Sequence, residues 1–155
     1  MLRHLRLVLG ATLIITGCAT LMSENRNAYR VSEVDASLTD LRASVTAVLP
    51  DGLRLMSSNG RELVSRHFVM VNDRPQPAAD ALDRYFAQVT ILGDRRPYDL
   101  EILVSHERRV LRDDRFVYVI VDYSTRLARD LETKIRQELT KRREERNVID
   151  DFRVF

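Results

Sequence analysis

Three runs joined by tight polar turns restrict the fold of this chain more than any other feature. The runs cover residues 84–92, 98–111 and 116–123, and the turns between them read GDRRP and RDDR. Apolar and polar side chains alternate cleanly in the second run, which is the period of a strand with one buried face. Strands joined by such short turns are antiparallel, because a parallel pair needs a long crossover. The sequence therefore predicts an antiparallel meander.

The segment before the meander predicts one helix and one hairpin. Apolar residues recur at helical spacing between Ser37, a suitable N-cap, and Pro50, which ends the pattern. Asn59-Gly60 then lies between two alternating runs, and both of these residues accept the positive φ that a tight hairpin turn requires. We expect the loop NDRPQP to follow the hairpin, because its two prolines restrict the backbone and lack N–H donors.

A long charged helix is predicted after the meander, starting at Ser124 or Thr125. Its narrow apolar stripe consists of Leu127, Leu131, Ile135 and Leu139. The expected fold is α+β, an antiparallel sheet of about four to five strands with an N-terminal and a long C-terminal helix packed on one face. Residues 37–155 would form this single domain. The tail 147–155 is rich in apolar residues, and we expect it to fold back onto the core.

The run FVYVIVDY differs from the other strands because it is apolar on both faces. Such a run is typical of a strand that is covered on two sides, or of one whose second face meets a partner. We therefore expect a partner surface at Val117, Val119 and Val121. The opposite row, Phe116, Tyr118 and Ile120, is the alternative.

The amino terminus has the order of a secretory signal peptide. Arg3 and Arg6 precede an apolar run, Leu7–Ile15, which is followed by the small residues Thr16 and Gly17. Nine helical residues span only ~14 Å, which is far less than the ~30 Å hydrocarbon core of a membrane. A stable membrane-spanning helix is therefore not expected here.

Ile15-Thr16-Gly17-Cys18 resembles the lipobox of bacterial lipoprotein precursors. The resemblance implies that residues 1–17 are removed, that Cys18 receives a diacylglycerol on sulfur, and that the new amino terminus is acylated. Ala19 in place of aspartate then implies the outer membrane, facing the periplasm, or the cell membrane if the organism has only one. We expect the polar residues 18–36 to form a flexible tether.

Removal of the leader also changes the charge. It takes Arg3 and Arg6 from the 25 basic residues and leaves 23 of them against 23 acidic ones. A formally neutral domain gives no reason to expect a nucleic-acid partner.

No catalytic, cofactor-binding or metal-binding residue is predicted. The two histidines after the leader, His67 and His106, have no second ligand at metal-binding spacing. Ser57, Ser58 and Ser65 are close to His67 in sequence, but no nucleophile elbow or orienting carboxylate accompanies them.

Two basic segments admit a binding role. Arg95 and Arg96 in GDRRPY can bind a carboxylate or sugar, although an ordinary polar turn explains them equally well. The basic end of the last helix contains Lys141, Arg142, Arg143 and Arg146, which we interpret as a solvated face that complements the helix dipole.

The sequence favours a lipid-anchored envelope protein that acts as a binding or assembly accessory without catalytic activity. Its partners would be the membrane, through the acyl chains on Cys18, and an envelope protein or a second copy of the chain. A periplasmic hydrolase acting on an envelope polymer and a carrier of small apolar ligands are the alternatives.

Overall fold

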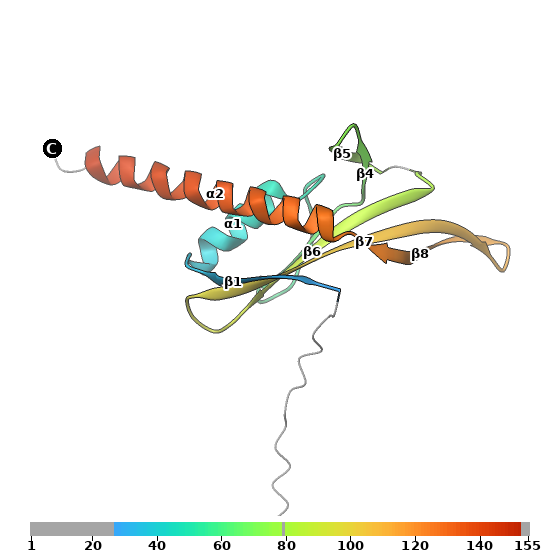
Figure 1. The fold of residues 1–155 in the computed structure, drawn as a ribbon, viewed down its shortest axis with the longest axis horizontal. Coiled ribbons are helices and arrows are strands. Elements are labelled where there is room, and N and C mark those ends of the chain that lie inside the picture. The colour runs from blue at the N-terminus through green and yellow to red at the C-terminus, as the bar shows by residue number, and fades with distance from the viewer. Residues whose placement is uncertain (1–26, 79, 153–155) are drawn as a thin grey trace, which may run out of the picture.

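A computed structural model describes residues 27–78 and 80–152. It has an open antiparallel sheet of eight strands and two helices, one of them C-terminal (Figure 1). The predicted α+β class is confirmed, and the predicted count of four to five strands is wrong. The strands are β1 (Tyr29–Val34), β2 (Leu53–Met56), β3 (Glu62–Ser65), β4 (Phe68–Val71), β5 (Arg74–Pro77), β6 (Asp83–Leu92), β7 (Tyr98–Arg112) and β8 (Arg115–Tyr123).

The central pair β6–β7 organises the sheet, because each of its outer edges is shared by two shorter strands. Along β7, β1 pairs with residues 98–102 and β8 pairs with residues 105–112. Along β6, β3 pairs with residues 88–90, whereas β4 reaches Tyr85. The remaining strands extend these short ones, since β2 pairs with β3 and β5 pairs with β4.

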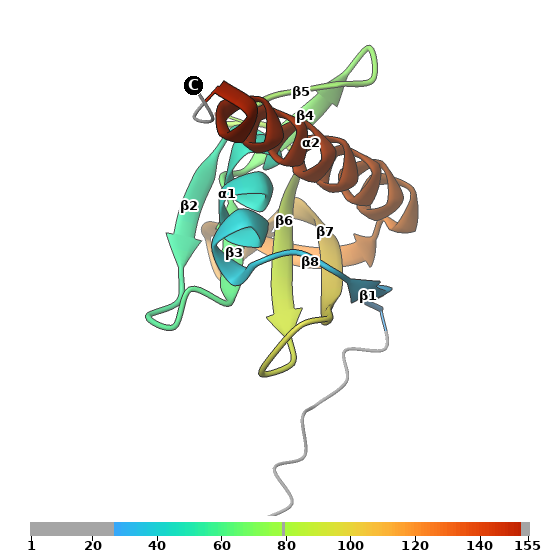
Figure 2. The same cartoon turned by 90° about the vertical axis from the view of Figure 1, so that its left-hand side faces the viewer.

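This sharing divides the sheet into two halves that we name by what lies over them. The covered half consists of β1, β2, β3, the β4–β5 hairpin and residues 87–92 and 98–104 of the central pair. Helices α1 (Leu38–Val48) and α2 (Thr125–Phe152) pack on one of its faces (Figure 2). The open half consists of β8 and residues 83–86 and 105–112, and it extends beyond α2 (Figure 1).

The hydrophobic core lies between the helices and the covered half. Its strand residues alternate as the sequence predicted, and its helix residues come from the predicted apolar stripes. The members that are almost fully buried include Leu41, Val45, Leu63, Phe68, Val89, Ile91, Leu100, Ile102 and Ile135. Ser37 begins α1 as predicted, because its hydroxyl accepts a hydrogen bond from the Asp40 N–H.

Two segments that were expected to be irregular form strands. Residues 29–34 of the predicted tether pair with β7 as β1, and Val31 and Val34 enter the core. The NDRPQP prediction is also wrong, because β4 and β5 form a hairpin whose turn residues Asn72 and Asp73 have positive φ. The prolines fit β5 because it is an edge strand, where a missing N–H costs no ladder hydrogen bond.

The expected turn of the tail at residue 147 does not occur, because helix α2 continues through Phe152. Residues 153–155 lie outside the described residues, so the packing of the tail on the core stays a prediction. Ion pairs between charged side chains one turn apart, Arg142 with Glu138 and Lys141 with Glu145, support its exposed end.

Candidate functional site

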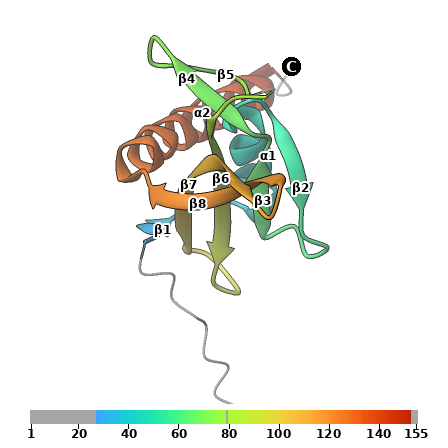
Figure 3. The same ribbon diagram turned by 90° about the vertical axis from the view of Figure 1, so that its right-hand side faces the viewer.

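The open half ends in the β7–β8 hairpin, whose outer strand is an edge of the sheet. β8 pairs with β7, and within the described ranges no other strand pairs with β8. It lies nearest to the viewer in Figure 3, in front of the rest of the sheet. An edge strand presents a row of unpaired backbone N–H and C=O groups that a strand of another chain can complete.

Large apolar side chains are exposed along this hairpin. Phe116 is 68% exposed and Leu111, its direct cross-strand neighbour, is 63% exposed. Ile120 and Val121 follow at 48% and 47%. Apolar side chains gathered on an exposed edge are typical of surfaces that bind another protein.

The structure divides the predicted partner surface. Val117 and Val119 are half-buried opposite Val110 and Arg108. The register then shifts, because His106 pairs with Asp122 while Glu107 pairs with Ile120, and Val121 is the extra residue of a β-bulge. The three valines therefore do not form one regular row. Among the residues of the alternative row, Phe116 and Ile120 are the exposed ones.

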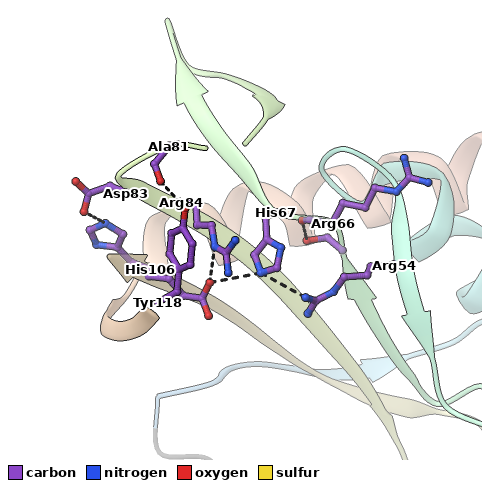
Figure 4. A network of polar contacts seen from close by, with 10 residues as sticks. Arg54, Arg66, His67, Ala81, Asp83, Arg84, His106 and Tyr118 are labelled. Atoms are coloured by element: carbon purple, nitrogen blue, oxygen red, sulfur yellow. Dashed lines mark hydrogen bonds and ion pairs between the residues drawn. The ribbon is translucent and has the colours of Figure 1, made fainter. Parts of the chain in front are cut away.

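Tyr118 ties the hairpin to the rest of the open half. Its hydroxyl donates a 2.8 Å hydrogen bond to the Ala81 carbonyl oxygen, and the guanidinium carbon of Arg84 lies 3.4 Å from its ring centroid (Figure 4). Arg84 Nε also donates to Glu107 Oε2 at 2.7 Å. Arg84 of β6 thus lies between the carboxylate of Glu107 on β7 and the ring of Tyr118 on β8. These contacts hold the β7–β8 hairpin against β6.

His67 lies at the other side of the same carboxylate. Its Nε2 is 3.4 Å from Glu107 Oε2 and 3.3 Å from Arg54 Nη1, and its ring meets Phe86 edge-on at 5.7 Å. Burial lowers the pKa of His67, Arg84 and Arg54 lower it further, and Glu107 raises it. The neutral ring, whose Nε2 accepts from Arg54, is therefore the favoured form.

A second ionic cluster lies on the opposite face of the sheet. His106 Nε2 is 3.0 Å from Asp83 Oδ1, and Arg108 Nε donates to the same oxygen at 2.7 Å. The hydrogen bond from Arg108 is the largest cause of the lowered pKa of Asp83. His106 stacks on Tyr85, whereas His67 contacts Phe86, the next residue on the strand. Consecutive strand residues point to opposite faces, so the two histidines are not brought together.

The serines near His67 are engaged by the backbone. The Ser65 hydroxyl is buried, accepts from the Ala87 N–H and donates to the Arg66 carbonyl oxygen. The Ser57 hydroxyl accepts from the Glu62 N–H inside the β2–β3 turn. Across residues 27–78 and 80–152, no hydrogen bond joins a serine hydroxyl to His67. These contacts give no support to the hydrolase alternative.

The space between α2 and the sheet is small. A cavity of about 40 Å³ lies there, with Phe68, Ala87, Val104 and Leu131 in its wall. A water molecule takes ~30 Å³ in the liquid, so the cavity has no room for an apolar ligand larger than a few atoms. This volume gives no support to the carrier alternative.

The described residues contain no group of three or more His, Cys, Asp or Glu side chains placed to hold a metal ion. Within the same residues, neither helix has the length and apolar character that crossing a membrane requires.

Cys18 lies outside the described residues, so its lipidation stays a prediction. The chain matches no protein-family model, no curated protein and no solved structure.

Sequence reasoning missed the residues that support the hairpin, namely Arg84, Glu107 and Tyr118. The alternation places Arg84 and Glu107 on the polar side of their strands, which was the available signal, whereas Tyr118 lies in a run that is apolar on both faces. The register β6–β7–β8 sets Arg84 opposite Glu107 and Glu107 opposite Ile120. That register depends on turn lengths and on the bulge at Val121, and neither can be obtained from the pattern alone.

Proposed function

We propose that this chain is a lipid-anchored protein of the cell envelope that binds another envelope protein through the β7–β8 hairpin. It acts as an assembly accessory and carries out no catalysis. The single observation that carries the proposal is the unpaired apolar edge of β8, where Phe116, Ile120 and Val121 are exposed beside open backbone groups.

The chemistry of this edge favours a partner that adds a strand. Backbone hydrogen bonds would supply the pairing, while Phe116 and Ile120 would enter apolar pockets on one face of it. The hairpin tip, residues 109–115, carries three arginines and two aspartates, while Arg108 beside it is paired with Asp83. Because this leaves an excess of one positive charge, a partner with acidic side chains beside its apolar strand fits better than a second copy.

The anchor would hold this edge close to the membrane. From Cys18 to the first residue of β1, Tyr29, the chain has eleven residue steps, which reach at most ~40 Å at full extension. The hairpin would therefore work within a shallow layer of the periplasm along the outer membrane. A partner embedded in that membrane or lying beside it suits this reach.

Site-specific photocrosslinking in cells tests the proposal. A photoreactive residue at position 116 or 120 should capture one partner protein, and the same residue at Leu55, which is exposed on β2, should not. Cys18→Ala should reduce the captured amount, because the untethered chain is no longer concentrated at the membrane.

The mass of the crosslinked product distinguishes the possible binding partners of the β8 edge. A product with twice the mass of the chain would assign the edge to a second copy and overturn the proposed partner. Equal capture from positions 55 and 116, or capture from neither, would contradict a specific surface on β8.

A further inference from the structure

A polar cavity lies at the other end of the molecule from the hairpin. It is bounded by the β1–α1 connection, the first turn of α1, the later turns of α2 and the β6–β7 loop, and α1 and α2 face the viewer in Figure 2. Its volume is about 170 Å³, which is room for several water molecules. We call it the arginine pocket, because its charged wall consists of Arg96, Arg142, Arg143, Arg146, Asp35 and Asp40.

The charges of this wall do not balance. Four arginines face two aspartates in the wall, and Glu138 beside it pairs with Arg142, so one positive charge is left in excess. Asp40 is already committed, because it accepts hydrogen bonds from the Ser37 hydroxyl at 2.6 Å and from Arg146 at 2.5 Å. Hydrogen bonds from Ser37 and Arg146 are the main causes of its lowered pKa, so Asp40 stays ionised as a fixed part of the wall.

The other three arginines are less well paired. Arg143 donates to a backbone oxygen, that of Asp35, at 3.1 Å. Arg142 Nε lies 3.0 Å from Glu138 Oε1, yet its buried N–H makes no hydrogen bond within the described residues, because the carboxylate is poorly aligned with it. Arg96 reaches the pocket from the β6–β7 loop, and no carboxylate of the described residues pairs with it.

We propose that the arginine pocket binds a phosphoryl group. Guanidinium groups bind phosphate oxygens through paired N–H donors, and here they approach from α2 and from the β6–β7 loop. Groups converging from two elements suit a tetrahedral anion better than a planar carboxylate. The excess of positive charge favours an anion. The amino terminus of α1 adds a favourable dipole, although Asp40 already compensates part of it.

The fold explains why the sequence alone does not predict the arginine pocket. Arg96 lies in the turn GDRRPY, which reads as an ordinary polar turn, and the α2 arginines read as a solvated helix end. Only the crossing of α2 over the β1–α1 connection brings the two segments to one cavity. The inference is independent of the partner surface on β8.

Phosphorus-31 NMR of phosphate probes tests the pocket with the full chain in a non-ionic detergent. Inorganic phosphate and a soluble short-chain phosphatidic acid are each titrated at constant ionic strength, which chloride maintains. We expect saturable binding of a probe that weakens at least about tenfold in Arg96→Gln and in Arg143→Gln, because each variant removes a charged donor. Arg115→Gln at the hairpin tip is the matched control, and it should bind as the unsubstituted chain does.

Each outcome decides a separate point. Binding of both probes identifies a general phosphoryl site, and binding of phosphatidic acid alone identifies a lipid headgroup site. An unchanged far-ultraviolet circular dichroism spectrum and thermal midpoint show that the variants are folded. No saturable binding of either probe, or equal weakening by Arg115→Gln, would overturn the proposal.

Discussion

The two halves of the sheet are built from the same two long strands but meet different environments. In the covered half, the apolar residues of β6 and β7 are almost completely buried beneath α1 and α2, as Ile91 and Ile102 are. In the open half, α2 starts directly after β8 and runs away from the hairpin (Figure 1). Phe116 and Ile120 pair with Leu111 and Glu107, on the face of the sheet that the helices do not cover, and both are exposed. Alternation marks the rows of side chains that can be buried, while the placement of the helices decides which row is.

The halves also differ in what holds their strands together. The covered half depends on packing in a continuous apolar core. The open half depends on polar side chains that lie over aromatic rings, with Arg84 over Tyr118 and Arg109 over Phe116. Truncating a densely packed side chain lowers the free energy of unfolding strongly, because it leaves a cavity. Each exposed cation–π contact contributes only about 0.5–1 kcal/mol to that free energy.

The largest contrast is expected between two isoleucines. Ile102→Ala should lower the free energy of unfolding by about 2–5 kcal/mol, because it leaves a cavity in the covered half. Ile120→Ala, on an exposed strand of the same sheet, should cost less than about 1 kcal/mol. Urea unfolding followed by circular dichroism measures both. Equal losses would mean that the open half is as tightly packed as the covered half.

A smaller contrast is expected between two glutamates on β7. Glu107→Gln should cost about 1–3 kcal/mol, because Glu107 and Arg84 are 14% and 18% exposed and Arg84 would lose its carboxylate. Glu101→Gln should cost about 0–1 kcal/mol, because its partner Arg30 is 49% exposed. The same unfolding measurement applies. A larger loss from Glu101→Gln would show that the ionic network does not support the hairpin.

A pH dependence of stability should arise from His67. Folding lowers its pKa, so the unfolded chain binds this proton more readily than the folded chain. The stability that neutral His67 provides is complete above pH ~6.5 and is lost as the pH falls through the lower folded-state pKa. Between pH 7 and 5, His67→Gln should flatten the fall in the free energy of unfolding.

His106→Gln serves as the control for this pH series, because it leaves the contacts of His67 in place. An identical slope in wild type and His67→Gln would disprove the assignment to His67.

The smallest change in stability is expected at the most exposed apolar residue. Phe116→Ser should alter the free energy of unfolding by no more than about 0.5 kcal/mol, because little of the ring is removed from water. The same variant should lose the crosslinked partner when the photoreactive residue is placed at position 120. A loss of stability above 2 kcal/mol would identify Phe116 as a structural residue instead.

Much of the fold could be predicted where local chemistry agrees with the final structure. The Asn59-Gly60 hairpin, the Ser37 cap and the three meander strands are confirmed because turn signals and alternation are local properties. The turn itself differs from the expected one, because Gly60 has positive φ and Asn59 does not. β1 was missed because YRVSEV is half polar, because its alternation breaks at Glu33, and because it pairs with β7, which lies far along the chain. β5 was missed because its prolines are tolerated only at an edge, and edges are not visible in a pattern.

The candidate sites could be predicted less well. The apolar strand at residues 116–123 was identified, but the bulge at Val121 and the exposure of Phe116 depend on tertiary structure. The arginine pocket combines residues from loops and helices that are far apart in the sequence, so no spacing reports it. Sites of this kind form only when the folded chain brings distant segments together.

The end-to-end placement of β1 and β8 along β7 has a mechanical consequence. A pull on the amino terminus enters the domain at Tyr29, opposite Ile102, and β8 leaves β7 at Ser105, three residues further on. Tension between a membrane anchor and a bound partner would pass from β1 through β7 into β8, without crossing the helices. The load path is therefore short, and under force β1 would lose its backbone hydrogen bonds to β7 together with the core contacts of Val31 and Val34.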